Sequence, residues 1–231
     1  WAMYDALVAA CDRVDADDTV RVFVVRAEGE AFAAGTDIRQ FTSFASGDEG
    51  LAYERKLDAV IDRLERVAVP TIAQVHGVAA GAGCAIALTC DFRVCTPAAQ
   101  FGVPIARTLG NCLSAANVAR IADLIGPART KDLLFTGRLI DAAEATSLGL
   151  VTAVVERQGL DAAVRDLAQT LAANAPLTIR ATKETLRRLA VRRRLDAGAA
   201  DDLIAACYAS ADFREGVASF IEKRRPRFTG R

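Results

Sequence analysis

Two bends made of small residues follow strand-like segments, and their backbone amides are the first candidates for chemistry. The later bend, His76–Ala85, contains three glycines and follows the apolar, β-branched segment Thr71–Val75. From Ala82 to Cys90 almost no side chain is polar, so we expect a buried helix that begins at Ala82. The first amides of a helix lack partners within it and lie at the positive end of its dipole, so they can bind a negatively charged oxygen. The alternative is a turn whose glycines serve packing alone.

The earlier bend, Ala31–Ile38, follows the strand-like segment Val20–Val25 and is again built from small residues. Its Asp37 is suited to cap a short helix, which is the structural interpretation of that carboxylate. The later bend is not a phosphate-binding loop, because no Gly-Lys-Ser/Thr follows it and its glycines do not have the Gly-x-Gly-x-x-Gly spacing.

Composition limits the classes of protein to which the chain can belong. The 231 residues are 52% hydrophobic, enough for one large domain or a domain with an extension. The 29 basic and 29 acidic residues cancel, which argues against nucleic-acid or membrane attraction, and no apolar run is long enough to span a bilayer. Six cysteines without a Cys-x-x-Cys pair, and the single histidine His76, argue against a metal site. We expect buried free thiols in a cytoplasmic protein and a structural role for His76.

The order of the predicted elements is that of an α/β domain with a helical extension. We place the core at 1–173 and the helical region at 174–231, and the start at Trp1 within a helix suggests a missing N-terminal piece. Asp91 is expected to bind backbone amides, and 42–50 and 105–112 are expected to be loops, the first of them mobile. The expected strands are 20–25, 71–75, 91–95, a short piece at 100–104, and 148–155, and the expected helices are 3–15, 51–67, 82–90, 113–125, 130–136, 141–147, 160–173, 176–191, 196–210 and 212–223.

An ordered set of motifs along essentially the whole chain resembles the enoyl-CoA hydratase/isomerase (crotonase) family. Each motif is weak alone, but their order and spacing are specific. They are Ala31–Ile38, His76–Ala85, Cys90-Asp91-Phe92-Arg93, Gln100-Phe101-Gly102, Leu134–Arg138, Ala142–Ala145 with Leu148–Val151, and Phe213–Gly216 with Phe220–Arg224.

The resemblance implies a crotonase-like spiral of ββα units that lacks the first strand, with an α-helical C-terminal region that forms homotrimers or hexamers. It implies a coenzyme A thioester as substrate and no further cofactor. Two backbone amides of the family bind the thioester oxygen, and they match Thr36 and Ala82 here. Donors fixed at that oxygen stabilise a thioester enolate and contribute about 3–4 kcal/mol each.

The chain departs from the family at the two positions where its hydratases carry glutamates. These positions match Ala85 and Ile105, and no Asp or Glu occurs from Phe92 to Arg120, where some isomerases place a carboxylate. Because a general acid or base contributes about 10²–10⁴-fold in rate, we expect poor hydration. Decarboxylation needs no general base, so Arg107 is a candidate holder for a substrate carboxylate and Asn111 a candidate polar group of the active-site wall.

The remaining candidates carry an alternative structural interpretation. Arg107 also fits a surface arginine, and Cys112 lacks a paired histidine and fits a packed thiol better than a nucleophile. The basic end at Arg224, Arg225 and Arg227 fits phosphate binding or a solvated terminus. Two functions remain open: an enolate-stabilising enzyme, such as a decarboxylase or isomerase, and an acyl-CoA-binding protein without catalysis. The residues that the resemblance assigns to coenzyme A are Phe32, Ala34, Asp37, Ile38, Gly81, Phe220 and Lys223.

Overall fold

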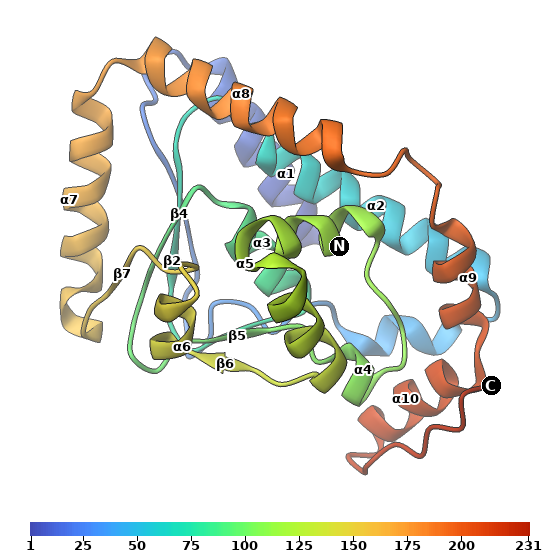
Figure 1. Cartoon of the computed structure of the whole chain (residues 1–231). Coiled ribbons are helices and arrows are strands. Elements are labelled where there is room, and N and C mark those ends of the chain that lie inside the picture. Colours follow the sequence, from blue (N-terminus) through green and yellow to red (C-terminus); the bar gives the residue numbers. More distant parts are fainter.

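The computed structural model describes residues 1–231, and its strands form two sheets (Figure 1). Four parallel strands in the order β1-β2-β4-β7 form the first sheet. In the second sheet β3 and β5 are parallel and β6 is antiparallel to β5. The strands are β1 (Phe23–Arg26), β2 (Thr71–Val75), β3 (Val78–Ala80), β4 (Phe92–Cys95), β5 (Gln100–Gly102), β6 (Ile140–Asp141) and β7 (Ala153–Val154).

The helices surround the sheets and make up all of the chain after Arg157 apart from short connections and the end. Two of them, η1 and η2, are 3₁₀ turns. The helices are α1 (Ala2–Ala16), η1 (Ile38–Ser43), α2 (Gly47–Glu65), α3 (Ala82–Thr89), α4 (Ile105–Thr108), α5 (Ala115–Thr136), α6 (Ala142–Ser147), η2 (Arg157–Gly159), α7 (Leu160–Ala173), α8 (Pro176–Arg193), α9 (Asp201–Ala209) and α10 (Ala211–Ile221).

The chain passes from the first sheet into the second twice, each time with a helix behind it. β2 leads into β3 and α3, and β4 leads into β5 and α4. These are two successive ββα units, as the resemblance implies. Each unit places the first turn of its helix directly after a strand of the second sheet.

The two faces of the parallel sheet pack on different helices, because neighbouring strand residues point to opposite sides. Ile72 and Val94 pack with Leu160 and Val164 of α7 in a small separate core, and Figure 1 shows α7 apart from the other helices on that side. The opposite face, including Val75, belongs to the main core with residues of α2, α3 and α5. The apolar β-branched run of β2 is therefore buried on both faces, as parallel strands require.

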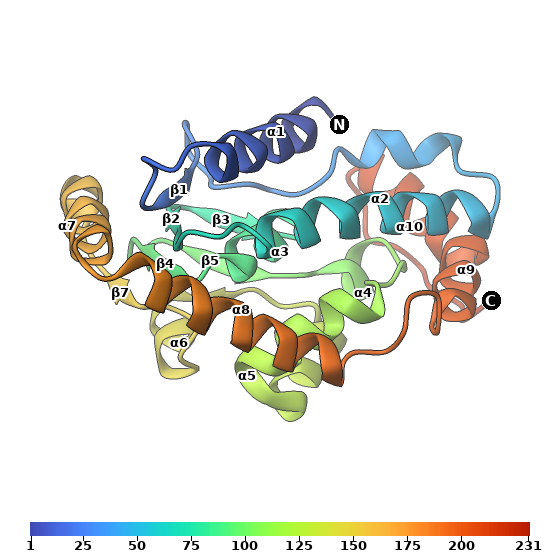
Figure 2. The ribbon, with the colours of Figure 1, turned by 90° about the horizontal axis from the view of Figure 1, so that it is seen from above.

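The helical end of the chain folds back over the rest. Figure 2 shows α8 running along one side of the molecule and α9 and α10 gathered at the end of α2. α9 packs on α2, and α10 packs on η1. No helix combines the length and the apolar character needed to cross a bilayer.

Several local expectations were wrong, and the sequence contains the reason for one of them. The predicted mobile loop at 42–50 holds the end of η1 and the start of α2, because Ser46 and Glu49 form a capping box. The predicted loop at 105–112 begins with α4. By contrast, the two helices expected at 113–125 and 130–136 both lie within α5 (Ala115–Thr136), and Gly126, with a non-helical φ of 76° and ψ of 161°, interrupts the helix where the first was expected to end. The last strand is reduced to Ala153–Val154.

Candidate active site

The two small-residue bends lie side by side, in register. Ala33 of the first bend pairs in parallel with Ala79 of β3, with hydrogen bonds from the Ala33 amide to the Val78 carbonyl (3.1 Å) and from the Ala80 amide to the Ala33 carbonyl (2.9 Å). Thr36 and Ala82 each come three residues after the paired alanines. Parallel pairing therefore brings these two residues to matching places beyond the edge of the second sheet.

Glycines allow this close approach. A Cβ on Gly83 would lie 2.2 Å from the Ala33 carbonyl oxygen, so any side chain there would separate the bends. Gly35 has φ of +97°, which side chains disfavour, and a Cβ on it would lie 3.5 Å from the Ala82 nitrogen. The glycines at these two positions therefore serve the contact between the bends, in addition to any local turn.

The amides of Thr36 and Ala82 are free to bind a ligand. The Thr36 N–H donates to no acceptor within the chain. Ala82 is the first residue of α3, so its N–H has no carbonyl partner inside the helix. The geometry places two available donors from two bends next to each other, one of them at the positive end of a buried helix.

Two tyrosines that sequence reasoning missed hold Thr36 in place. The Thr36 hydroxyl lies 2.8 Å from the Tyr4 hydroxyl and 2.7 Å from the Tyr53 hydroxyl, at hydrogen-bond distance in both cases. Burial raises the pKa of both tyrosines, so both stay neutral. The side chain of Thr36 is thus occupied by α1 and α2, and only its backbone amide remains for a ligand.

The buried side chain of Arg93 binds carbonyl groups at the C-terminal end of α3. Its guanidinium donates to the carbonyls of Leu150 and Cys90, the latter at 2.5 Å, and reaches those of Ala87 and Leu88 at 3.3 Å. A cation is favourable at the negative end of a helix. Asp91 accepts from the Thr71 amide at 2.7 Å, which confirms its predicted role in binding backbone N–H groups.

The two positions that the resemblance matches to hydratase glutamates carry apolar side chains. Ala85 lies in the first turn of α3 and Ile105 begins α4, and both are half-buried. Ile105 and Asn111 lie on a largely apolar cavity of about 530 Å³ between α4, α5 and α9. Neither apolar side chain can transfer a proton.

A buried carboxylate, Glu54 of α2, lies behind the segment Asn111–Ser114, and sequence reasoning missed it. It is 2% exposed, accepts from the Tyr208 hydroxyl at 2.7 Å and accepts from the Ser114 amide at 3.2 Å. Burial, helped by the neighbouring Asp58 and opposed by the two hydrogen bonds, raises the pKa of Glu54 to about 7. Its spacing to Leu57 was the available signal, since that spacing places Glu54 on the apolar face of the helix.

Asn111, a candidate from the sequence, is linked to Glu54 through the Tyr208 hydroxyl. Its side-chain amide donates to the Tyr208 hydroxyl at 3.0 Å, and its carbonyl oxygen is buried without a partner. Arg107 lies on α4, exposed, with no carboxylate of the chain paired to it. Cys112 lies 3.8 Å from the Leu203 carbonyl and next to Cys207, and both the hydrogen bond with Cys207 and burial raise the pKa of Cys112. A packed thiol describes it, as expected.

The residues assigned to coenzyme A lie in three places. Phe32 is buried, Ala34 is exposed, and Ile38 begins η1. Asp37 caps η1 through the Arg39 amide, as predicted, and also pairs with the Arg39 side chain. The Gly81 amide is bonded to the Gly102 carbonyl, at 3.0 Å.

The end of α10 carries the third group, at a distance along the chain from both bends. Phe220 is 51% exposed, and Lys223 follows the helix in a left-handed conformation. Arg224 pairs with Glu215 and Glu222, so this part of the basic end is neutralised within the chain.

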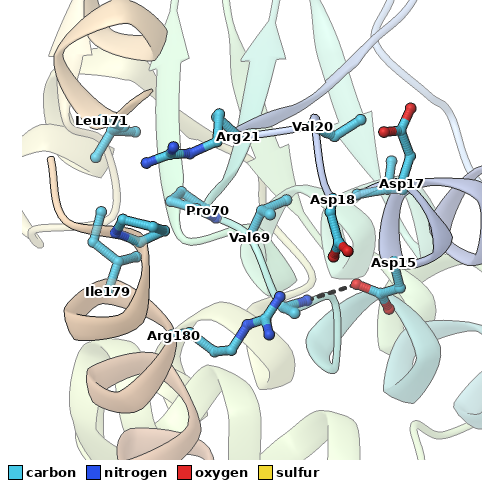
Figure 3. A pocket seen from close by; sticks show the side chains of 13 residues that line it. Asp15, Asp17, Asp18, Val20, Arg21, Val69, Pro70, Leu171, Ile179 and Arg180 are labelled. Atoms are coloured by element: carbon cyan, nitrogen blue, oxygen red, sulfur yellow. Dashed lines mark hydrogen bonds between the residues drawn. The ribbon is translucent and has the colours of Figure 1, made fainter. Parts of the chain in front are cut away.

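His76 and a hollow at the other end of the sheet lie outside this arrangement. The His76 Nε2 donates to the Gly29 carbonyl at 2.9 Å, so the ring is structural, as predicted. Figure 3 shows the hollow, lined by Asp15, Arg21 and Arg180 among others. It adjoins Pro70, at the amino end of β2, whereas both bends follow the carboxyl ends of strands, where α/β proteins bind ligands.

Comparisons with known proteins give one consistent likeness. The model of the enoyl-CoA hydratase/isomerase family matches residues 2–231. A probable enoyl-CoA hydratase of Mycobacterium bovis is 35% identical over 227 residues, covering 97% of this chain and 86% of the relative. The mitochondrial methylglutaconyl-CoA hydratase of Homo sapiens is 33% identical over 235 residues, covering 97% of this chain and 67% of the relative.

Among solved structures, sequence likeness and shape likeness do not rank in the same order. An enoyl-CoA hydratase/carnitine racemase from Magnetospirillum magneticum is 33% identical with a TM-score of 0.79, covering 100% of this chain and 86% of that one. A methylmalonyl-CoA decarboxylase in complex with 2-nitronate-propionyl-CoA is 26% identical with a TM-score of 0.90, covering 99% of this chain and 88% of that one.

Proposed function

Since this chain belongs to the enoyl-CoA hydratase/isomerase family, whose members act on CoA thioesters, we propose that it stabilises a thioester enolate and decarboxylates a malonyl-type acyl-CoA. The observation that carries the proposal is the matched placement of the Thr36 and Ala82 amides on adjacent bends. Two backbone donors at one carbonyl oxygen stabilise the negative charge that develops on it.

The apolar side chains of Ala85 and Ile105 favour some of the reactions that pass through an enolate over others. Hydration requires a group that positions and deprotonates water beside the β-carbon, and Ala85 and Ile105 supply none. In decarboxylation the bond to the carboxylate breaks, CO2 leaves, and its electron pair delocalises onto the thioester oxygen, before the α-carbon takes a proton from water. This reaction needs the two amides but no base. The high structural likeness to a methylmalonyl-CoA decarboxylase supports the same choice.

The unpaired Arg107 fits the extra carboxylate of such a substrate. Its guanidinium is exposed on α4, two residues after Ile105, and no acidic side chain of the chain neutralises it. Arginine binds carboxylates through two parallel hydrogen bonds. We also propose that coenzyme A runs along Phe32–Ile38, that its adenine end meets Phe220 and Lys223, and that no further cofactor takes part.

A screen of thioesters tests the reaction. Purified protein is mixed separately with crotonyl-CoA, malonyl-CoA and methylmalonyl-CoA, and products are followed by mass spectrometry and by the absorbance of the conjugated thioester. We expect loss of CO2 from a malonyl-type ester and little change in crotonyl-CoA. Rapid consumption of crotonyl-CoA would overturn the proposal.

A second candidate is an acyl-CoA-binding protein without turnover. One observation favours it: the buried carboxyl Glu54 is engaged by Tyr208 and Ser114 rather than directed at the bends. Tight binding of thioesters with no conversion of any of them would support this candidate.

We further propose that α8 mediates self-association, as the resemblance implies. It has no buried residue, and Leu177, Leu186 and Leu189 are 73%, 62% and 53% exposed. Exposed leucines in such number on one helix indicate a surface that is covered by another chain. Light scattering after size-exclusion chromatography measures the mass, and a trimer or hexamer is expected.

A further inference from the structure

The strongest unexplained group in the molecule is the Glu54 carboxyl. It is 2% exposed and forms no ion pair. The titratable groups that face it are Tyr53 and Asp58 on its own helix, Tyr208 on α9, and Cys112 on the active-site wall. None is a cation, and placing an unpaired carboxylate in an apolar interior costs several kcal/mol. A buried carboxyl with a perturbed pKa beside a ligand site is a candidate for function.

The carboxyl is connected by hydrogen bonds to both ends of one short segment, Asn111–Ser114, directly at Ser114 and through Tyr208 at Asn111. One oxygen accepts from the Ser114 amide at 3.2 Å. The other accepts from the Tyr208 hydroxyl at 2.7 Å, and that hydroxyl accepts from the Asn111 side-chain amide at 3.0 Å. This segment follows α4, and its Asn111 lines the apolar cavity together with Ile105.

The direction of these hydrogen bonds depends on the charge of Glu54. An ionised carboxylate only accepts, so Tyr208 must donate to it and Asn111 must donate to Tyr208. This order leaves the Asn111 carbonyl oxygen without a partner, as the structure shows. A protonated carboxyl can donate to Tyr208, whose hydrogen then turns to Asn111, and the carboxamide must rotate to offer its oxygen. Protonation therefore reverses the order of donor and acceptor along these hydrogen bonds and rotates the Asn111 carboxamide on the cavity wall.

We propose that Glu54 is a positioning residue for the acyl end of the site, whose ionised carboxylate fixes Asn111–Ser114 in the arrangement that accepts the acyl group. The inference rests on the proposed function as far as the ligand is an acyl-CoA. Glu54 acts through Tyr208 and Ser114 and does not touch the thioester. When Glu54 is neutral, the Asn111 carboxamide is rotated and the segment does not accept the acyl group.

The size of the effect follows from the pKa of about 7 for Glu54, raised by burial. At pH 6 about one tenth of the protein is ionised at this carboxyl, so the apparent acyl affinity falls about tenfold relative to pH 8. Cys207 is a competing source of pH dependence, since a hydrogen bond from Cys112 lowers its pKa to about 7. A Cys207→Ser variant separates the two.

The experiment measures calorimetric affinities for butyryl-CoA and for free coenzyme A at pH 6 and pH 8, and uses their ratio. Titration of the coenzyme A phosphates affects both affinities equally, so its effect cancels in the ratio. We expect the wild-type ratio to change about tenfold between the two pH values. Glu54→Gln should show the pH 6 ratio at both, and Cys207→Ser should behave as wild type.

Asp58→Asn is the matched control, because Asp58 lies one turn further along α2 and holds the same segment through the Ser114 hydroxyl at 2.7 Å. It removes a charge that raises the pKa of Glu54, so the pH dependence should persist with its midpoint at a lower pH, even if stability falls. A constant wild-type ratio, a pH-dependent Glu54→Gln, or a pH dependence lost with Cys207→Ser would each overturn the inference alone. If neither coenzyme A nor butyryl-CoA binds the wild type, the proposed function fails and the inference falls with it.

Discussion

The substitution Gly83→Ala tests the contact between the two bends. Its Cβ would lie 2.2 Å from the Ala33 carbonyl oxygen and 2.6 Å from the Ala33 Cβ, whereas ordinary contacts begin at 3.4 Å. The obstructing oxygen belongs to the backbone, so the first bend must move away from α3 by about 1.2 Å, the difference between those distances. The Thr36 amide would move with it, while the Ala82 amide would stay at the start of α3.

The expected consequences differ in size for stability and for chemistry. Overpacking of this kind costs about 1–3 kcal/mol of unfolding free energy, which a protein of this size can survive. A displacement of about 1 Å in a catalytic group can cost 10²-fold in rate. We therefore expect turnover of the preferred thioester to fall about 100-fold, in protein that still unfolds cooperatively in urea.

Gly159→Ala is the control for the general cost of replacing glycine by alanine. Gly159 has an ordinary φ of −96°, and a Cβ there meets nothing within 4 Å. It should leave both measurements near wild type. Wild-type turnover in a folded Gly83→Ala would show that the separation of the bends does not matter, and the reasoning about paired amides would be refuted.

Three further outcomes follow. Thr36→Val removes hydroxyl contacts to two tyrosines and should lower the urea-unfolding free energy by about 1–2 kcal/mol; an unchanged midpoint would contradict the role of that hydroxyl. The pKa of Glu54 is raised from 4.5 to about 7 in the folded state, so its contribution to stability is present below pH 4.5 and is lost as pH rises through 7. That loss amounts to about 3 kcal/mol, and Glu54→Gln should abolish it in urea titrations at pH 5 and pH 8. The double substitution Ala85→Glu with Ile105→Glu should raise crotonyl-CoA hydration by at least about 100-fold, and no gain would mean that these positions do not face the β-carbon.

Elements defined by local pattern could be predicted closely. The bounds of β2 and α7 are those expected, because an unbroken β-branched run and a long amphipathic stretch leave few alternatives. The start of α3 at Ala82 was also expected, from the change of composition after Gly81. The capping box at Ser46 and Glu49 was readable but was overlooked in a stretch whose polarity suggested a loop.

Features that depend on distant pairing could not be predicted. Tyr208 and Glu54 are 154 residues apart in sequence, and only the return of α9 onto α2 brings them together. The same holds for Tyr4, whose contact with Thr36 requires α1 to lie over the first bend. Sequence pattern identifies which face of a helix is buried, but it does not identify what meets that face.

The parallel pairing of Ala33 with Ala79 makes chain length, rather than residue identity, the fixed quantity at this site. Side chains at Thr36 and Ala82 can be exchanged without removing a donor, because each donor belongs to the main chain. Inserting or deleting one residue between a paired alanine and its donor would shift one amide by a full residue and turn it elsewhere. Such a scaffold can acquire new reactions through substitutions of the side chains around the two bends. Insertions or deletions inside either bend should abolish all of these reactions.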